Sequence, residues 1–460
     1  MFGHPKGLGI LFFTEMWERF SFYGMRAILV LFLVAKASEG GFSWTNTQAL
    51  SLYGTYSMLV YLMSIPGGII ADNLLGQKKS VMAGGFLLCA GHLLMAYTQV
   101  WSFYTALTLI ILGVGLLKPN ISTMVGGLYP EGDHRRDAGF TIFYMGINLG
   151  SLLATLIVGF IGETYGWHYG FSLAGFGMIL GQIVFIWGQK HLADVGNLEK
   201  KEIIKSTEKK EIVNFRFTKE DKDRLIVLGI SFVIVMVFWM SFEQAGGFMS
   251  LYTKDFVDRH LFGWEIPASM FQSLNPLFII LFGSAVAALW IKLEDKRKKN
   301  YSAIFKMGIG TVILGLGFLF MVGASLQKHV DASGHVVQYS AMYWLVGAYL
   351  FHTIGELCLS PVALSFITKV APKKLVSSIM GIYFAVTGLS DKLASEIGKQ
   401  ADKLGDLTVF AGLVIFAVVM GSLLAIFSNR ISKLTHGAED KHDLEAEINL
   451  NNLSLEKQVS

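Results

Sequence analysis

Apolar segments long enough to cross a bilayer recur twelve times along the 460-residue chain, and they constrain its fold more than any other feature. A membrane-spanning helix needs about 20 mostly apolar residues. Six segments precede a polar stretch and six follow it, at about 8–35, 48–71, 79–98, 101–127, 139–162, 170–190, 224–250, 270–292, 303–325, 341–368, 376–398 and 406–428. Charged residues make up 16% of the chain, against about 25% in a soluble domain. The sequence predicts an all-α integral membrane protein with twelve transmembrane helices.

Lysine and arginine gather in alternate loops, which predicts the orientation of the chain. The basic loops hold Lys78 and Lys79, Arg135 and Arg136, a run from Lys200 to Arg224, Lys296 to Lys299, Lys373 and Lys374, and Arg430 and Lys433. Because basic loops stay on the cytoplasmic side, we expect both termini and the central linker to be cytoplasmic. The N-terminus lacks a cleavable signal peptide pattern. We therefore expect a multi-pass protein of the plasma (inner) membrane that keeps its first helix.

Six helices, a cytoplasmic linker and six more helices are the layout of the major facilitator fold, whose halves are related by an axis along the membrane normal. The expected boundaries are 1–190 for an N-terminal six-helix bundle, 191–222 for the linker, 223–430 for a C-terminal six-helix bundle and 431–460 for a cytoplasmic tail. The linker, rich in lysine and glutamate, is interpreted as a solvated tether, with a surface helix as the alternative. The polar tail is expected to be disordered.

The first apolar segment contains four charged residues: Glu15, Glu18, Arg19 and Arg26. At about 100° per residue they share one face of a helix with Phe22 and Tyr23, within an arc of about 140°. Each ionisable group at the centre of a membrane helix costs about 2.5–3.5 kcal/mol on insertion scales, so such groups face a protein interior or a water-filled cavity. This face predicts a polar site inside the protein.

Three more charged residues lie in apolar segments where a helix is interrupted: Lys118, Glu243 and Glu356. The bases come from the first half of the chain and the lone carboxylates from the second, so a zwitterion could be held by opposite charges at its two ends. The competing interpretation is that these seven charges only pair with one another to hold the bundle together. Buried ion pairs often fail to offset their desolvation, which argues against stability as the only reason for so many charges.

Two motifs stand out, EMWERFSFYG at 15–24 and FYMGINLGS at 143–151. They resemble the ExxERFxYYG and FYxxINxGS signatures of the proton-dependent oligopeptide transporter (POT, or PTR) family of the major facilitator superfamily. Further matches follow in order along both halves: GLLKPN at 115–120, FW at 238–239 with EQ at 243–244, NP at 275–276, and GEL at 355–357 with SP at 360–361. The resemblance covers nearly the whole chain.

This resemblance implies a symporter that imports di- and tripeptides with protons by alternating access. It implies a proton-coupling set consisting of Glu15, Glu18, Arg19 and Glu243. It implies that Arg26 and Lys118 receive the peptide carboxylate and that Glu356 receives its amino terminus. The set implied to bind substrate is Tyr23, Arg26, Tyr61, Lys118, Tyr144, Asn148, Trp239, Asn275, Glu356 and Ser360. The expected partners are peptides, protons and the lipid bilayer, with no nucleic acid, metal or cofactor.

The hypothetical cycle is electrostatic. Glu15 is expected to form an ion pair with Lys118. Protonation of the Glu15 carboxylate would break this pair and free Lys118 to bind the peptide carboxylate. Two pairs that span the halves, Arg26 with Glu243 and Lys118 with Glu356, are expected to close one side of the protein when they form.

Two departures from the family pattern bear on substrate choice. Phe22 replaces the first of two paired tyrosines, and Tyr383 stands where many members have tryptophan. One alternative is a transporter of the same fold for another small anionic or zwitterionic solute. A membrane enzyme is the other alternative, but the chain has no HExxH, GxSxG or Walker-type motif.

Overall fold

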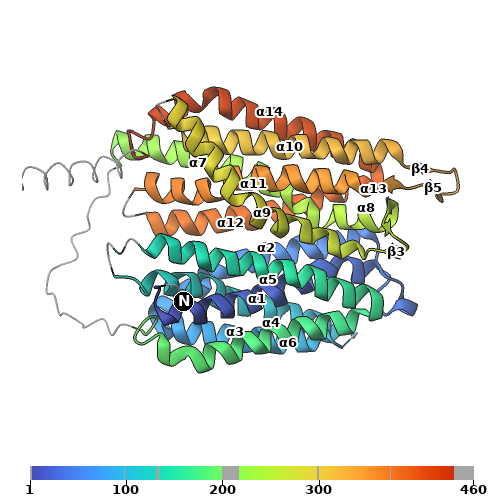
Figure 1. Ribbon diagram of the computed structural model, residues 1–460, viewed down its shortest axis with the longest axis horizontal. Coiled ribbons are helices and arrows are strands. Elements are labelled where there is room, and N and C mark those ends of the chain that lie inside the picture. Colours follow the sequence, from blue (N-terminus) through green and yellow to red (C-terminus); the bar gives the residue numbers. More distant parts are fainter. Residues whose placement is uncertain are drawn as a thin grey trace, which may run out of the picture.

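The computed structural model describes residues 3–97, 99–130, 133, 135–198, 217–297, 300–372 and 375–439. Most of the predicted linker and tail lies outside the described residues, as do four of the predicted loop lysines: Lys298, Lys299, Lys373 and Lys374. The described chain is mostly helical, and its long helices run roughly along one direction (Figure 1).

The first half of the described chain forms six long helices linked by short helical turns. Their bounds are α1 Lys6–Val34, η1 Ala37–Glu39, α2 Asn46–Ile70, η2 Ala71–Leu75, α3 Gln77–Met95, α4 Val100–Gly127, α5 Arg135–Tyr165, α6 Trp167–Gly188 and η3 Gln189–His191. Helix α1 packs against α5 and α6, and α3 packs against α4 and α6. Their buried apolar side chains form one cluster, which Leu251 and Ala268 of the second half join.

The second half repeats this pattern with more interruptions. Its bounds are α7 Lys219–Phe242, η4 Glu243–Gly246, α8 Phe248–Phe256, β1 Val257–Asp258, β2 His260–Leu261, β3 Trp264–Glu265, η5 Ala268–Ser273, α9 Leu274–Arg297, α10 Ala303–Gln327, β4 His329–Val330, β5 Val336–Gln338, β6 Ser340–Ala341, α11 Tyr343–Val370, α12 Val376–Gly398, α13 Ala401–Leu404 and α14 Asp406–Lys433. The strands pair as β1 with β6 in parallel, and as β2 with β3 and β4 with β5 in antiparallel hairpins. A second cluster of buried apolar side chains runs from Val227 to Ala438.

Each predicted apolar segment coincides with a helix in the described chain. Nine of these helical stretches are long and apolar enough to cross a bilayer. The other three, α1, α3 and α12, have 29, 19 and 23 residues and pack among them. Many large apolar side chains remain exposed, Trp187 at 76% and Ile426 at 71% among them. Such exposure suits helices that are surrounded by lipid, which is as apolar as these side chains.

Local sequence explains where α7 begins and ends. Thr218 and Asp221 form a reciprocal capping box at its start. At its other end the helix gives way to the tight turn η4 at Glu243, which confirms the predicted interruption there. The interruptions predicted at Lys118 and Glu356 are wrong, because α4 and α11 continue through both positions with a proline inside each helix. A Cβ atom on Gly246 would lie only 2.0 Å from the Tyr53 hydroxyl oxygen, so a side chain at this turn would block the contact with α2.

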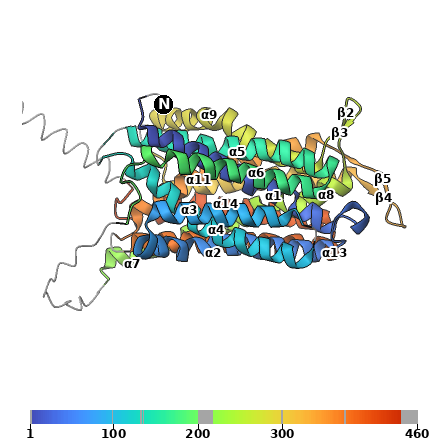
Figure 2. The same ribbon diagram turned by 90° about the horizontal axis from the view of Figure 1, so that it is seen from below.

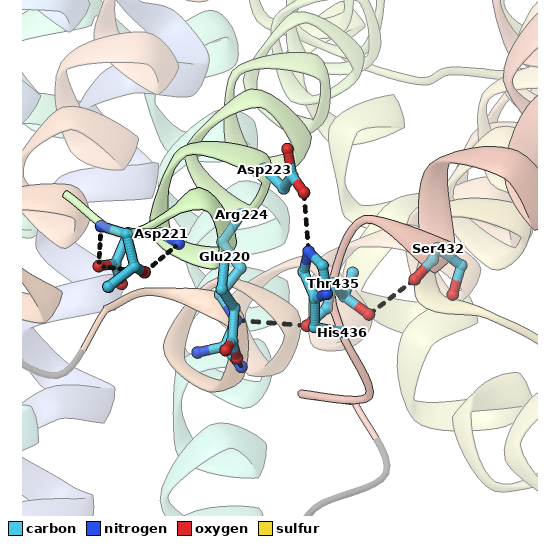
Figure 3. A network of polar contacts seen from close by, with 8 residues as sticks. Glu220, Asp221, Asp223, Arg224, Ser432, Thr435 and His436 are labelled. Atoms are coloured by element: carbon cyan, nitrogen blue, oxygen red, sulfur yellow. Dashed lines mark hydrogen bonds and ion pairs between the residues drawn. The ribbon is translucent and has the colours of Figure 1, made fainter.

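The start of α7 is joined to the segment that follows α14 (Figure 3). His436 Nε2 lies 2.8 Å from Asp223 Oδ2, and Arg224 Nε donates to the Thr435 carbonyl at 3.3 Å. Figure 2 shows the beginnings of α1 and α7 at one end of the molecule and the strand pairs at the other. We call the first end the linker end, because α6 ends and α7 begins there.

Candidate functional site

Glu15, Glu18 and Arg19 of α1 form one buried cluster. Arg19 Nε lies 2.8 Å from Glu15 Oε1 and 2.6 Å from Glu18 Oε2. Positions 15, 18 and 19 lie on one helix face because they are three and four residues apart. All three side chains are 3% exposed or less. Two carboxylates therefore share one guanidinium, which leaves one negative charge in excess when both are ionised.

A second ion pair joins the two halves of the chain. Arg26 of α1 pairs through Nη2 with Glu243 of η4, and its Nε donates to the Tyr53 hydroxyl of α2 at 2.6 Å. The guanidinium also lies 5.4 Å from the centroid of the Tyr53 ring. The predicted pairing of Arg26 with Glu243 is confirmed.

Lys118 of α4 has a different environment from the one predicted. Its Nζ lies 4.0 Å from the centroid of the Tyr61 ring, a cation–π contact. None of the ion pairs in the described part of the chain includes Lys118. The expected pairs of Lys118 with Glu15 and with Glu356 are therefore not formed in this conformation, because Arg19 engages Glu15 and an amide engages Glu356.

Glu356 of α11 is bound by a neighbouring helix of the same half. Asn275 Nδ2, at the start of α9, donates to Glu356 Oε2 at 2.8 Å and lies 3.1 Å from Thr353 Oγ1. Glu356 is 9% exposed. Tyr144 of α5, which is 43% exposed, lies within electrostatic range of this carboxyl group. Glu356 is therefore bound by an amide of its own half and lies within electrostatic range of an aromatic hydroxyl of the other.

The remaining predicted residues are less closely tied to the charged groups. Asn148 donates through its amide to the Tyr144 carbonyl of its own helix at 3.0 Å. Trp239 makes edge-to-face contacts with Phe238 and Phe242. Tyr23 is partly buried and contacts Phe22 edge to face, and Ser360 is partly buried on α11.

A buried carboxylate outside the predicted set of site residues lies on α12. Asp391 is 2% exposed, and neither of its carboxylate oxygens has a hydrogen-bond partner. The sequence signal was an aspartate inside the segment 376–398. Lys392 and Glu396 follow it closely, so the stretch resembles the polar end of a helix. Asp391 thus joins Glu15, Glu18, Arg19, Glu243 and Glu356 as a buried charged residue of the described chain, while Arg26 and Lys118 are partly buried.

The described residues contain no group of three or more histidine, cysteine, aspartate or glutamate side chains that could hold a metal ion. The candidate site therefore consists of charged side chains, some in ion pairs and some without an ion-pair partner among the described residues.

Comparison with known proteins gives the family. The profile of the POT family matches residues 78–210 and 190–411. The chain belongs to the POT family. The peptide transporter YePEPT of Yersinia enterocolitica is 36% identical to it, over 95% of this chain and 96% of that protein. A di-/tripeptide transporter of Lactococcus lactis is 34% identical, over 94% of this chain and 97% of the relative.

The three-dimensional structure is also similar to solved structures of POT family transporters. A crystal structure of a POT peptide transporter in complex with sulfate superposes with a TM-score of 0.85 at 35% identity, covering 94% of this chain and 96% of that one. The predicted major facilitator fold is confirmed by this likeness. This POT protein is therefore a multi-pass membrane transporter and not an enzyme.

Proposed function

We propose that this POT protein is a proton-coupled symporter that imports di- and tripeptides by alternating access. The names of the Yersinia and lactococcal relatives support peptides as the cargo. The observation that carries the proposal is the separation of charge between the halves. A partly buried lysine of the first half has no carboxylate partner among the described residues, and a carboxylate of the second half is bound only by neutral groups.

The proposed substrate site holds a peptide by its two ends. Lys118 and Arg26 receive the peptide carboxylate, since Lys118 has no competing ion pair in the described chain. Glu356 receives the amino terminus, and the Asn275 amide keeps its carboxyl group in place. The walls between these ends comprise Tyr23, Tyr61, Tyr144, Asn148, Trp239, Asn275 and Ser360. Charge-assisted hydrogen bonds at both ends favour a short zwitterion over a neutral solute.

The proposed proton sites are the three carboxylates that pair with arginines: Glu15, Glu18 and Glu243. Glu15 and Glu18 share Arg19, so the cluster has one excess negative charge that a proton neutralises. Glu243 pairs with Arg26, and protonation of Glu243 would free Arg26 for the peptide carboxylate. Protons and peptide would then bind together, which is the requirement of symport.

The contacts between the halves suggest which side is closed. In the described chain, every hydrogen bond and ion pair between the halves lies away from the linker end, as in Thr47 with Asp402, Leu50 with Ser395, and Arg26 with Glu243. On α5 the carboxylate of Glu163 accepts from the backbone N–H groups of Ala268 and Ser269 at 3.0 and 2.7 Å. We infer a conformation that is closed on the side opposite the linker end. Alternating access would then proceed by rocking of the two halves around the substrate site.

We further propose that the two halves are six-helix bundles with the boundaries 1–190 and 223–430, joined by the cytoplasmic segment 191–222 and followed by the tail 431–460. The two largely separate clusters of buried apolar side chains support this division. Basic loop residues support cytoplasmic termini and insertion in the inner membrane. Labelling of single cysteines near each terminus with a membrane-impermeant reagent, in intact and in opened cells, tests this topology.

Transport by purified protein in proteoliposomes tests the function. With an imposed inward proton gradient, we expect uptake of a labelled dipeptide above its equilibrium level, and competition by unlabelled di- and tripeptides. A gradient-dissipating ionophore should abolish accumulation and leave peptide counterflow. If no peptide competed and another small anion or zwitterion were taken up, that solute and not peptides would be the cargo.

A further inference from the structure

Asp391 lies where α12 crosses α2. A Cβ atom on Gly54 of α2 would lie 2.4 Å from Ser395 Cβ and 3.2 Å from the Asp391 carbonyl oxygen, so the two helices touch backbone to backbone at this point. A Cβ atom on Gly388, one turn before Asp391, would lie 3.0 Å from Tyr61 Cβ. Asp391 is thus buried at the contact between α12 and the helix that carries Tyr53 and Tyr61.

The charged groups that act on this carboxylate are the two bases of the proposed substrate site. Arg26 and Lys118 are the cations within electrostatic range of Asp391. The hydroxyls of Tyr53 and Tyr61 are also in range. On α12 itself, Lys392 is engaged by Thr55 at 3.0 Å and Glu396 at 3.1 Å. On η4, Glu243 is engaged by Arg26.

The two bases do not neutralise Asp391 by direct contact. Arg26 is committed to Glu243 and Tyr53, and the Lys118 ammonium contacts the Tyr61 ring. A buried carboxylate without hydrogen bonds is unstable as an anion unless nearby positive charge compensates it. The charge state of Asp391 therefore depends on whether the positive charge of Arg26 and Lys118 is available.

We propose that Asp391 is a further proton-binding residue of this transporter, which takes up a proton when a substrate carboxylate engages Arg26 and Lys118. This inference rests on the proposed function. A bound carboxylate neutralises the two bases, so the Asp391 anion loses its compensation and its neutral form is favoured. One O–H bond forms on the Asp391 carboxylate with a proton from water. The proton returns to water when the substrate leaves. Proton binding and peptide binding are thereby linked electrostatically, without direct contact between the peptide and Asp391.

Proton uptake on peptide binding tests the inference directly. The full chain in detergent, in weakly buffered solution with a pH indicator, is mixed with a dipeptide and with the same dipeptide amidated at its C-terminus. We expect Asp391→Asn to bind about one proton fewer per peptide than the wild type, as expected for loss of one titrating carboxyl group. The amidated dipeptide should show no difference between the two proteins. Glu39→Gln, which changes an exposed acid far from Asp391 in sequence and outside the proposed site, should behave as the wild type.

The outcomes separate the inference from the proposed function. Unchanged proton uptake by Asp391→Asn would overturn the role of Asp391 and leave peptide symport intact. Absence of any peptide-linked proton uptake in the wild type would instead overturn proton-coupled transport. Asp391→Ser is a second neutral variant, and Asp391→Glu should restore proton uptake. If both neutral variants failed to fold while Asp391→Glu folded, the carboxyl group would be structural and the inference wrong.

Discussion

The basic residues of the candidate site differ in how many partners compensate their charge. Arg19 serves two carboxylates, Arg26 serves one carboxylate and one hydroxyl, and Lys118 contacts only an aromatic face among the described residues. These inequalities matter because a buried charge responds strongly to a neighbour that gains or loses a proton. The residues with incomplete partners are therefore those at which substitution is most informative.

Glu18→Gln should uncouple transport from the proton gradient. The substitution removes the excess negative charge beside Arg19 and keeps the size of the side chain. We expect concentrative uptake of a dipeptide in proteoliposomes to fall about tenfold or more, the effect of about 1.4 kcal/mol or more, while counterflow remains within about twofold. Glu39→Gln, at an exposed glutamate beyond α1, is the matched control. Normal proton-driven accumulation by Glu18→Gln would contradict the coupling role.

Glu356→Gln should weaken binding of peptides that have a free amino terminus. A hydrogen bond to a charged group contributes about 1.5–3 kcal/mol, so we expect affinity to fall at least about tenfold. The same dipeptide with an acetylated amino terminus cannot form this bond, and its affinity should not fall. Competition against a labelled dipeptide measures both. An equal loss for both ligands would assign Glu356 to folding and not to the amino terminus.

Pairs of helices in this protein approach closely where a glycine faces a backbone. Helix α2 contacts α4 through Gly67, whose added Cβ atom would lie 1.9 Å from the Gly115 carbonyl oxygen. It contacts α12 through Gly54. Small residues allow such approaches between membrane helices, where van der Waals packing replaces the hydrophobic effect as the driving force. Helix α2 therefore packs against both α4, which carries Lys118, and α12, which carries Asp391.

Gly67→Ala should destabilise the protein, and Gly68→Ala should not. An added methyl group at position 67 must push α2 away from the α4 backbone, at a cost of about 1–3 kcal/mol for overpacking. At position 68 nothing lies within 4 Å of the added atom. Thermal unfolding of the two variants in the same detergent measures the difference. Equal melting temperatures would mean that α2 and α4 can separate there without cost.

The molecule as a whole consists of two groups of helices joined across their faces away from the linker end (Figure 1). These joining contacts include a few hydrogen bonds and one buried ion pair, while each half has its own cluster of buried apolar side chains. Motion between the halves therefore breaks polar contacts and leaves both apolar clusters largely intact. Such a division suits alternating access by rocking.

A disulfide between cysteines at positions 47 and 402 should stop transport. Thr47 Oγ1 lies 2.6 Å from Asp402 Oδ2 across the two halves, so Thr47→Cys with Asp402→Cys brings two thiols together. Cys89 and Cys358 are replaced by alanine first, since both are free. Oxidation should abolish uptake and reduction should restore it. Ser325→Cys with Asp406→Cys, a similar pair at 2.8 Å within the second half, is the control that should keep its uptake after oxidation. Uptake by the oxidised 47–402 protein would contradict rocking at this face.

The linear sequence determined the helices, the fold class and the family, because segment length, apolarity and local motifs are properties of neighbouring residues. It also predicted the pair of Arg26 with Glu243. It did not predict that Arg19 would engage both Glu15 and Glu18, nor that Lys118 would contact Tyr61 instead of a carboxylate. Those outcomes depend on a few ångströms of helix rotation and on which competing partner is nearer. The burial of Asp391 was likewise decided by tertiary structure alone, since it follows from the packing of α12 against α2, which are far apart in the sequence.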